Sequence, residues 1–227
     1  LFLDSLKNRH NDIFLDVGPG GGTSFSSALS ILDEPVLAAI ELAEDAIQDF
    51  QNIYSVTGGS SISDVVTKLK SKPKIVLSSH SLEHFTFKGA LKFINDVNEF
   101  LDPNGVFICE VPSEDFKKNM AVKGEHAPHF LFFSKASLRK LFESNGFEVK
   151  FIDTCSLTFD FIDELNNSEE EIITHPALEK GAKSFIKNIV KSILLKFNRR
   201  GRVILDNHDF KYGGDRICLR IVAVKKN

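Results

Sequence analysis

Four glycines and an acidic residue lie close together near the start of the chain, in the segment D-V-G-P-G-G-G-T. Asp16 stands two residues before Gly18, and Gly20 and Gly22 follow at intervals of two. A backbone without Cβ atoms lets a ligand lie directly against it, and the free N–H groups of such a turn and of a following helix would face that ligand. The carboxylate could meet a cationic group. The pattern indicates a ligand-binding turn, although a tight strand-to-helix turn without a ligand also fits it.

Two known spacings of small residues can be compared with this turn. The dinucleotide fingerprint G-x-G-x-x-G/A would use Gly18 and Gly20 and a small residue at position 23, where the chain has Thr23. The spacing D-x-G-x-G-x-G is complete, from Asp16 to Gly22, and it resembles motif I of the class I S-adenosylmethionine (SAM)-dependent methyltransferases. The resemblance implies that SAM is the cofactor and that the turn binds it through Asp16, Gly18, Pro19, Gly20 and Gly22.

A second acidic residue ends the next apolar run, P-V-L-A-A-I-E. Glu41 lies 23 residues after Gly18, and an acid at the end of the second strand can accept hydrogen bonds from both ribose hydroxyls of a nucleoside. The alternative is a carboxylate that faces the dipole of the following helix. Its position favours the ribose role.

A second motif, S-S-H-S-L-E-H-F, continues the apolar run that begins at Lys74. It is similar to the segment after the fourth strand in many small-molecule and sugar methyltransferases. The resemblance implies that Ser79, the backbone around His80 and Leu82 contact the methionine end of SAM, and that the segment ending at His84 borders the acceptor site. For both histidines, a hydrogen-bonded loop residue is the alternative.

A histidine pair, His126 and His129, lies in a long polar segment. The H-x-x-H spacing lacks the Glu of H-E-x-x-H and has no obvious third ligand nearby, so we predict no metal site. The two residues are either structural loop histidines or acceptor-site residues, because the resembling proteins often carry a histidine-containing loop at this place. A neutral imidazole suits a general base near pH 7. Our candidates for a catalytic base are His126, His129 and His84.

The elements that must position these residues alternate between strand and helix. We expect strands over 12–17, 35–41, 53–56, 74–79, 106–111, 147–154 and 217–225. We expect helices over about 23–32, 43–50, 61–69 and 88–101, and a further helix capped by Ser134. The fold class is therefore α/β: a Rossmann-like class I methyltransferase sheet of seven strands, mostly parallel with one antiparallel strand, and helices on both faces.

Composition limits the classes of function. Of the 227 residues, 42% are hydrophobic and 26% are charged, and the net charge of −3 provides no basic field for nucleic acid. The cysteines are three in number and far apart, which is typical of reduced thiols in a cytoplasmic protein. No apolar run approaches the roughly 20 residues that span a bilayer, and Leu1 to Leu3 are followed by Asp4 instead of an apolar signal core. We expect a cytoplasmic protein with a small-molecule acceptor and no nucleic-acid partner.

Residues 155–213 form a segment that the smallest version of this fold does not have. We interpret 1–227 as one methyltransferase domain in which 155–213 is an inserted lid or helical segment before the last strand. Within it, 181–197 is a basic amphipathic helix, and further arginines extend its charge to position 202. This helix either packs over the sheet or contacts a membrane surface or a lipid-linked substrate.

The resemblance implies transfer of the SAM methyl group to a small-molecule acceptor, such as a sugar or a lipid- or nucleotide-linked intermediate, with oxygen preferred over nitrogen or carbon. Two other functions stay open. One is a catalytically silent SAM-binding subunit. The other is an NAD(P)-dependent oxidoreductase, which Thr23 at the third small position disfavours.

Overall fold

The computed structural model describes residues 11–113, 130–156, 211–212 and 218–226. By its backbone contacts the chain divides into one unit of Leu1–Cys155 with Tyr212–Asn227 and a second unit of Ser156–Lys211. Almost all of the predicted insertion at 155–213, including the basic helix at 181–197, lies outside the described residues. The one-domain interpretation with an inserted lid stays a prediction. No described helix has the length and apolarity needed to cross a membrane.

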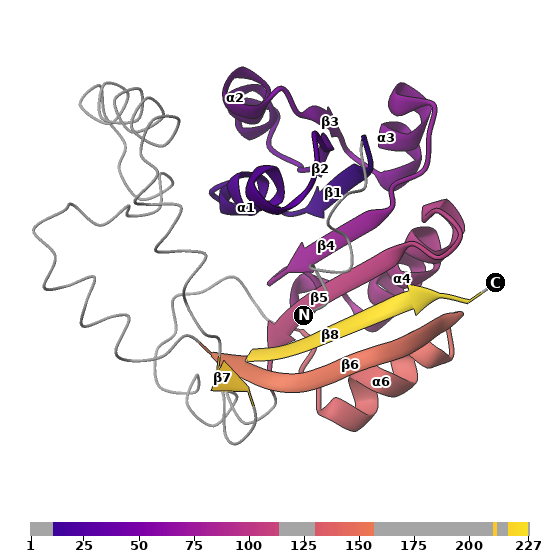
Figure 1. Cartoon of the computed structure of the whole chain (residues 1–227). Coiled ribbons are helices and arrows are strands. Elements are labelled where there is room, and N and C mark those ends of the chain that lie inside the picture. Colours follow the sequence, from indigo (N-terminus) through magenta and orange to yellow (C-terminus); the bar gives the residue numbers. More distant parts are fainter. Residues whose placement is uncertain (1–10, 114–129, 157–210, 213–217, 227) are drawn as a thin grey trace, which may run out of the picture. The chain divides into compact units, whose positions relative to one another are not determined.

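A single mixed sheet forms the centre of the first unit, in the order β3-β2-β1-β4-β5-β8-β6-β7 (Figure 1). Its strands are β1 Ile13–Val17, β2 Val36–Ile40, β3 Thr57–Gly59, β4 Ile75–Ser79, β5 Val106–Pro112, β6 Phe147–Ser156, β7 Lys211–Tyr212 and β8 Cys218–Lys225. Strands β1 to β5 pair in parallel, and β8 lies between β5 and β6 antiparallel to both. The predicted sheet of seven strands with one antiparallel strand is confirmed, and the two-residue β7 adds to its edge.

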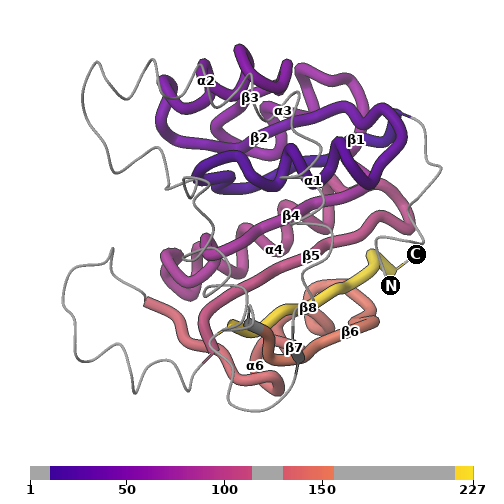
Figure 2. The backbone as a smooth tube through the Cα atoms, turned by 60° about the vertical axis from the view of Figure 1, so that its left-hand side comes forward, coloured from indigo at the N-terminus to yellow at the C-terminus, as the bar shows by residue number. Residues whose placement is uncertain are grey.

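Helices cover both faces of this sheet. They are α1 Thr23–Ile31, α2 Glu44–Tyr54, α3 Ile62–Leu69, α4 Phe87–Phe100 and α6 Lys135–Glu143, with a 3-10 turn, η2, at Leu82–His84. Successive side chains of a strand point to opposite faces. Ile13, Leu15 and Val17 of β1 belong to the core on the side of α3, α4 and α6. Phe14 belongs to the core on the side of α1 and α2. Figure 2 shows the central strands running side by side between these layers.

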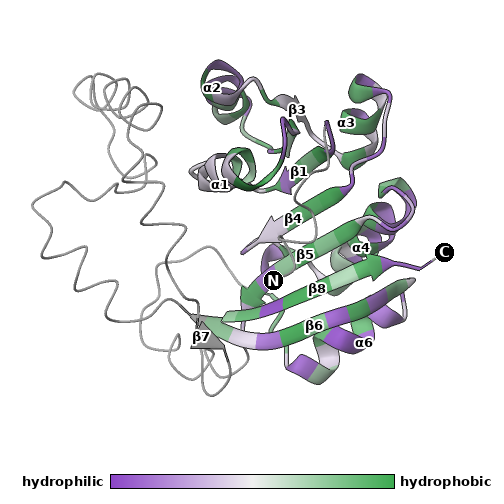
Figure 3. Cartoon of the chain, viewed as in Figure 1, coloured by the Kyte–Doolittle hydropathy of each residue, from purple (hydrophilic) through white to green (hydrophobic). Residues whose placement is uncertain are grey.

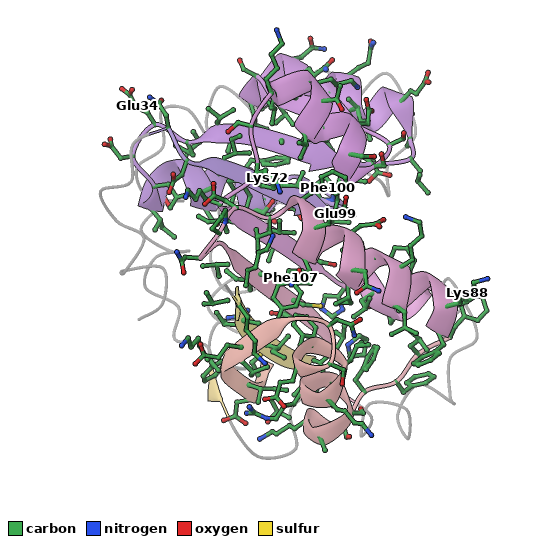
Figure 4. The ribbon with its side chains drawn as sticks, turned by 90° about the vertical axis from the view of Figure 1, so that its right-hand side faces the viewer. Glu34, Lys72, Lys88, Glu99, Phe100 and Phe107 are labelled. Atoms are coloured by element: carbon green, nitrogen blue, oxygen red, sulfur yellow. The ribbon has the colours of Figure 1, made fainter. Side chains whose placement is uncertain are left out.

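Aromatic rings fill the larger of the two cores. Phe107 on β5 is fully buried, and its ring centroid lies 5.0–5.9 Å from those of Phe93, Phe142 and Phe147. These residues come from β5, α4, α6 and β6, so one ring joins four elements. Hydrophobic colour runs along β5 and β8 in Figure 3, and Figure 4 shows Phe107 between the helices and the sheet.

The end of α4 is closed by lysines from other elements. Lys72 donates to the carbonyl of Glu99 at 2.8 Å, and Lys225 donates to that of Leu101 at 3.0 Å. Figure 4 shows Lys72, Glu99 and Phe100 together at this end, far from Lys88 at the other. Lysines beside the last carbonyls satisfy groups that the helix leaves unpaired and oppose its dipole.

The predicted third strand at 53–56 is wrong. Helix α2 continues to Tyr54, whose ring packs 5.6 Å from that of Phe25, and the strand is Thr57–Gly59. Gly58 and Gly59 read locally as a turn, because glycine is disfavoured in strands. In the fold, a Cβ on Gly58 would lie 2.2 Å from a side-chain carbon of Ile47. Close packing of α2 on the strand therefore selects glycine here.

Phe107→Ala should lower the free energy of unfolding by about 3–5 kcal/mol, because it removes the shared ring from the core and leaves a cavity. Phe87→Ala is the matched control, since that ring is 65% exposed, and it should cost less than about 1 kcal/mol. Urea unfolding followed by circular dichroism measures both. Equal losses in the two variants would contradict this account of the core.

Candidate functional site

The glycine turn lies at the carboxyl end of β1, next to the place where the strand order reverses. From β1 the chain builds outward through β2 and β3, and then crosses to β4 on the other side of β1. The carboxyl edge beside such a reversal is where open α/β sheets bind ligands. Figure 1 shows β1 and β4 ending at the same edge, whereas β8 points the opposite way.

The turn has the left-handed backbone that its glycines allow. Gly18, Gly20 and Gly22 have φ values of 70°, 54° and 73°, a conformation that costs other L-residues energy. The N–H of Gly18 donates to the carbonyl of Ile40 at 2.9 Å, and that of Gly22 donates to Pro19 at 2.8 Å. Gly22 is the N-cap of α1 without a side-chain cap, so N–H groups of the first helical turn are left for water or a ligand.

Ser81 joins the ends of β1 and β4. Its hydroxyl donates to the carbonyl of Val17 at 2.9 Å. A Cβ on Gly18 would lie only 2.4 Å from that same Oγ. Gly18 is therefore required for the contact between two strand ends as well as for its φ value. Sequence reasoning assigned this glycine to the cofactor alone.

Asp16 carries a buried carboxylate. Its Oδ2 accepts a hydrogen bond from the hydroxyl of Ser24 on α1, and Oδ1 has no hydrogen-bond partner within the described residues. Burial raises the pKa of Asp16 to about 6, which the Ser24 and Val17 hydrogen bonds oppose and nearby Glu41 assists. A buried oxygen without a partner is costly. The orphaned atom fits a site that a polar or cationic ligand completes.

Glu41 follows β2 and folds back on the start of α2. Its Oε1 accepts from the N–H groups of Leu42 at 2.7 Å and Ala43 at 3.3 Å. Its own N–H donates to Gly59 at 3.2 Å. Both backbone donors use Oε1, so Oε2 is the oxygen left for a ligand. Glu41 can therefore both accept hydrogen bonds from the start of α2 through Oε1 and bind ribose hydroxyls through Oε2.

The end of β4 turns sharply at His80. This residue has a φ of 53°, in the left-handed region that non-glycine residues rarely adopt, and its N–H donates to the carbonyl of Glu110 at 2.9 Å. Ser79 pairs with Glu110 in the β4–β5 register. Leu82 is fully buried in the core, so any contact of Leu82 with a cofactor would use its backbone.

A polar cluster lies on the same sheet edge, between β4, β5 and β8. Nε2 of His80 is 3.5 Å from Oε1 of Glu110 and 3.5 Å from Sγ of Cys218. Nδ1 of His80 is 3.3 Å from Oε1 of Glu83, and neither oxygen of Glu83 accepts a hydrogen bond from the described residues. Oε2 of Glu110 accepts two hydrogen bonds from Arg220, at 2.8 and 2.5 Å.

Electrostatics in this cluster favour ionised groups. The Cys218 contact, followed by the carboxylates of Glu110 and Glu83, raises the pKa of His80 to about 12. Burial acts to raise the pKa of Glu110, but His80 and Arg220 outweigh it and hold that pKa below its usual range. An imidazole with such a pKa is protonated at neutral pH and does not serve as a general base.

Sequence reasoning missed most of this cluster. In the sequence, Glu83 stands out only as part of a motif and Cys218 only as one of three separated thiols, and neither Glu110 nor Arg220 is a candidate. A signal was present, because Glu110 and Arg220 are single charges of opposite sign inside the apolar runs V-F-I-C-E-V and I-C-L-R-I-V. Among the candidate bases, His84 lies exposed in η2, whereas His126 and His129 lie outside the described residues.

The fold and this edge define a class of protein: an open mixed sheet whose glycine turn, acidic second-strand end and β4 loop lie at one carboxyl edge. The family model described as a methyltransferase domain matches residues 2–150, more than half of the chain. The chain belongs to this methyltransferase family, in the class I SAM-dependent group that we inferred from its motifs. It is an enzyme domain, and SAM is its cofactor.

Solved structures of similar fold agree with that family. The complex of the Haloferax volcanii Trm112 methyltransferase activator with a putative methyltransferase gives a TM-score of 0.61 at 12% identity, covering 100% of this chain and 87% of that one. A SAM-dependent methyltransferase from Archaeoglobus fulgidus gives a TM-score of 0.56 at 17% identity, and the match covers 95% of this chain and 86% of that one. The plantazolicin methyltransferase BpumL, in complex with a pentazolic desmethylPZN analogue and SAH, gives a TM-score of 0.57 at 13% identity, and the match covers 100% of this chain and 81% of that one. No curated protein matches the sequence significantly.

Asp16→Asn should stabilise the ligand-free protein, and more so at higher pH. The pKa of Asp16 is about 6 in the folded protein and about 3.9 in an unfolded chain. Its ionisation therefore destabilises the fold progressively as pH rises through this interval. The gain from Asn should be larger at about pH 8 than at about pH 5 by roughly 1–1.5 kcal/mol. Urea unfolding at the two pH values measures this, and a pH-independent difference would contradict it.

Proposed function

We propose that the enzyme transfers the methyl group of SAM to a small-molecule acceptor, and to an oxygen atom in preference to nitrogen or carbon. The observation that supports the cofactor position is that the uncapped start of α1, the orphaned Oδ1 of Asp16 and the carboxylate of Glu41 all follow strand ends at one edge of the sheet. A methyltransferase acting on the small molecule plantazolicin has the same fold. The sugar or lipid- or nucleotide-linked acceptor class belongs to this proposal as well.

The proposed binding mode assigns one part of SAM to each element. The turn Gly18–Gly22 lies against the cofactor, with Asp16 toward its cationic portion. Glu41 accepts from the ribose hydroxyls. The backbone of Ser79, His80 and Leu82 contacts the methionine end, which matches the burial of the Leu82 side chain and the irregular backbone at His80.

Glu41→Ala should weaken SAM and its demethylated product about equally, by roughly 1.5–3 kcal/mol or about 10–150-fold, because charge-assisted hydrogen bonds to the ribose are lost. Titration calorimetry with both ligands measures this. Glu99→Gln is the matched control, since its exposed side chain lies at the carboxyl end of α4 and its removal should leave both affinities unchanged. An unchanged SAM affinity in Glu41→Ala would remove the ribose role.

The reaction asks for alignment and exclusion of water more than for covalent chemistry. The acceptor attacks the methyl carbon in line with the leaving sulfur, and the positive charge on sulfur is lost in the transition state. Asp16 and Glu41 therefore act in binding. A hydroxyl acceptor must also lose its proton, and a neutral imidazole is suited to take it. His80, held protonated by its neighbours, is a poor candidate for this step.

The base is proposed among His84, His126 and His129. Support comes from the segment that follows His129: the N–H groups of Phe130 and Leu131 donate to the carbonyl of Glu83 at 2.9 and 3.2 Å. This joins that segment to η2, immediately beside His84. Phe130 and Leu131 are thus fixed beside η2, and this contact supports the proposal.

Replacing the base by glutamine should lower kcat by about 10²–10⁴-fold while SAM affinity stays the same. The three single variants are compared under saturating SAM with the identified acceptor, and the pH–rate profile of the affected variant should lose its acidic limb. If all three variants keep kcat, the acceptor needs no base from these histidines, and the methyl-transfer function would still stand.

A catalytically silent SAM-binding subunit is the second candidate function. One neighbour in fold is a complex that contains a methyltransferase activator. In this alternative, the chain would bind SAM but would be active only with a partner protein. Turnover by the isolated chain with any acceptor excludes it. We further propose a cytoplasmic location, no nucleic-acid substrate, and a substrate or membrane contact of the basic segment 181–202.

A further inference from the structure

We propose that His80, Glu110 and Cys218 form a binding site for a thiophilic divalent cation of the Zn²⁺ class. One ligand atom from each of these residues lies within 4.8 Å of the other two. The ligands come from the loop after β4, from β5 and from the first residue of β8. The proposal uses the side chain of His80, whereas the proposed SAM contact uses its backbone, so the two sites are separate claims.

The spacing of the donor atoms fits tetrahedral coordination. Nε2 of His80 lies 3.5 Å from Sγ of Cys218 and 3.5 Å from Oε1 of Glu110. Zinc–sulfur and zinc–nitrogen bonds of about 2.3 and 2.0 Å at tetrahedral angles put their donor atoms about 3.5 Å apart. Two of the three donor spacings therefore match a tetrahedral ion, which binds once Nε2 of His80 gives up the proton that it carries in the metal-free protein.

The second oxygen of the carboxylate is already used, which leaves the first for the ion. Arg220 binds Oε2 of Glu110 through two donors, and this holds Oε1 toward His80. One thiolate and one carboxylate also balance the charge of a divalent cation. Three protein ligands leave one tetrahedral position for water or an acceptor atom, as in catalytic zinc sites.

Glu83 provides an independent indication. Its side chain is 1% exposed, yet neither of its oxygens accepts a hydrogen bond from the described residues. Oε1 lies 3.3 Å from Nδ1 of His80, which is an ion-pair contact without hydrogen-bond geometry. Metal-bound histidines commonly give their second N–H to a carboxylate, which directs the other nitrogen to the metal. A buried carboxylate behind a histidine fits that arrangement.

The test uses the full chain, stripped with a chelator and titrated with Co²⁺ and then Zn²⁺. We expect about one ion per chain and a thiolate-to-cobalt charge-transfer band in the near ultraviolet. Cys218→Ser should remove that band. Cys155→Ser is the matched control, because Cys155 pairs with Cys218 across β6 and β8 but its Sγ lies 3.9 Å from the oxygen of Glu110 that Arg220 binds. This variant should keep the band.

Glu83→Gln separates a metal site from a plain ion-pair network. It should keep the cobalt band but weaken Zn²⁺ about 10–100-fold, as the loss of a carboxylate behind a ligand histidine does. Absence of the band in the wild type, or its survival in Cys218→Ser, would overturn the proposal. The proposal would also be overturned if folded Cys155→Ser lost the cobalt band while Cys218→Ser kept it. SAM binding by the metal-free wild type is measured in parallel, so a failed metal test leaves the methyltransferase function intact.

Discussion

The hydrogen bond from Ser81 to the carbonyl of Val17 holds together the ends of the two central strands, and the site depends on it. It brings the loop after β4 against the glycine turn after β1, at the reversal of strand order. The same contact leaves no room for a side chain on Gly18. With the bond from Gly18 to Ile40, it places the ends of β2, β1 and β4 at one edge, where a long ligand can touch all three.

Two kinds of buried charge lie along this edge. Asp16 has one oxygen without a partner in the described structure and a raised pKa, which is the state expected of a group that a ligand completes. Glu110 is instead compensated by His80 and by Arg220. The first arrangement costs stability in the absence of a ligand, and the second does not. The edge therefore carries an uncompensated carboxylate, Asp16, on β1 and a compensated one, Glu110, on β5.

The chain and its neighbours in fold share little sequence, between 12% and 17% for the three compared. What they share is the fold. Fold of this kind is compatible with many acceptors, because acceptor specificity is set by loops and side chains at the edge. The polar cluster around Glu110 lies at this edge, and it joins residues of the β4 loop, β5 and β8.

The sequence by itself determined the elements whose signals are local. Apolar runs predicted the strands other than β3 and the two-residue β7, the glycine spacing predicted the turn, and the position of Glu41 predicted an acid at the end of β2. Only the tertiary structure decided β3, where Gly58 fits beneath Ile47, and the cluster in which Cys218 meets His80 across 138 residues. Periodicity and spacing report on neighbours along the chain. The partners of a glycine packed under a helix, or of a single charge in an apolar strand, are set by strand order and register, which emerge only when the whole sheet is assembled.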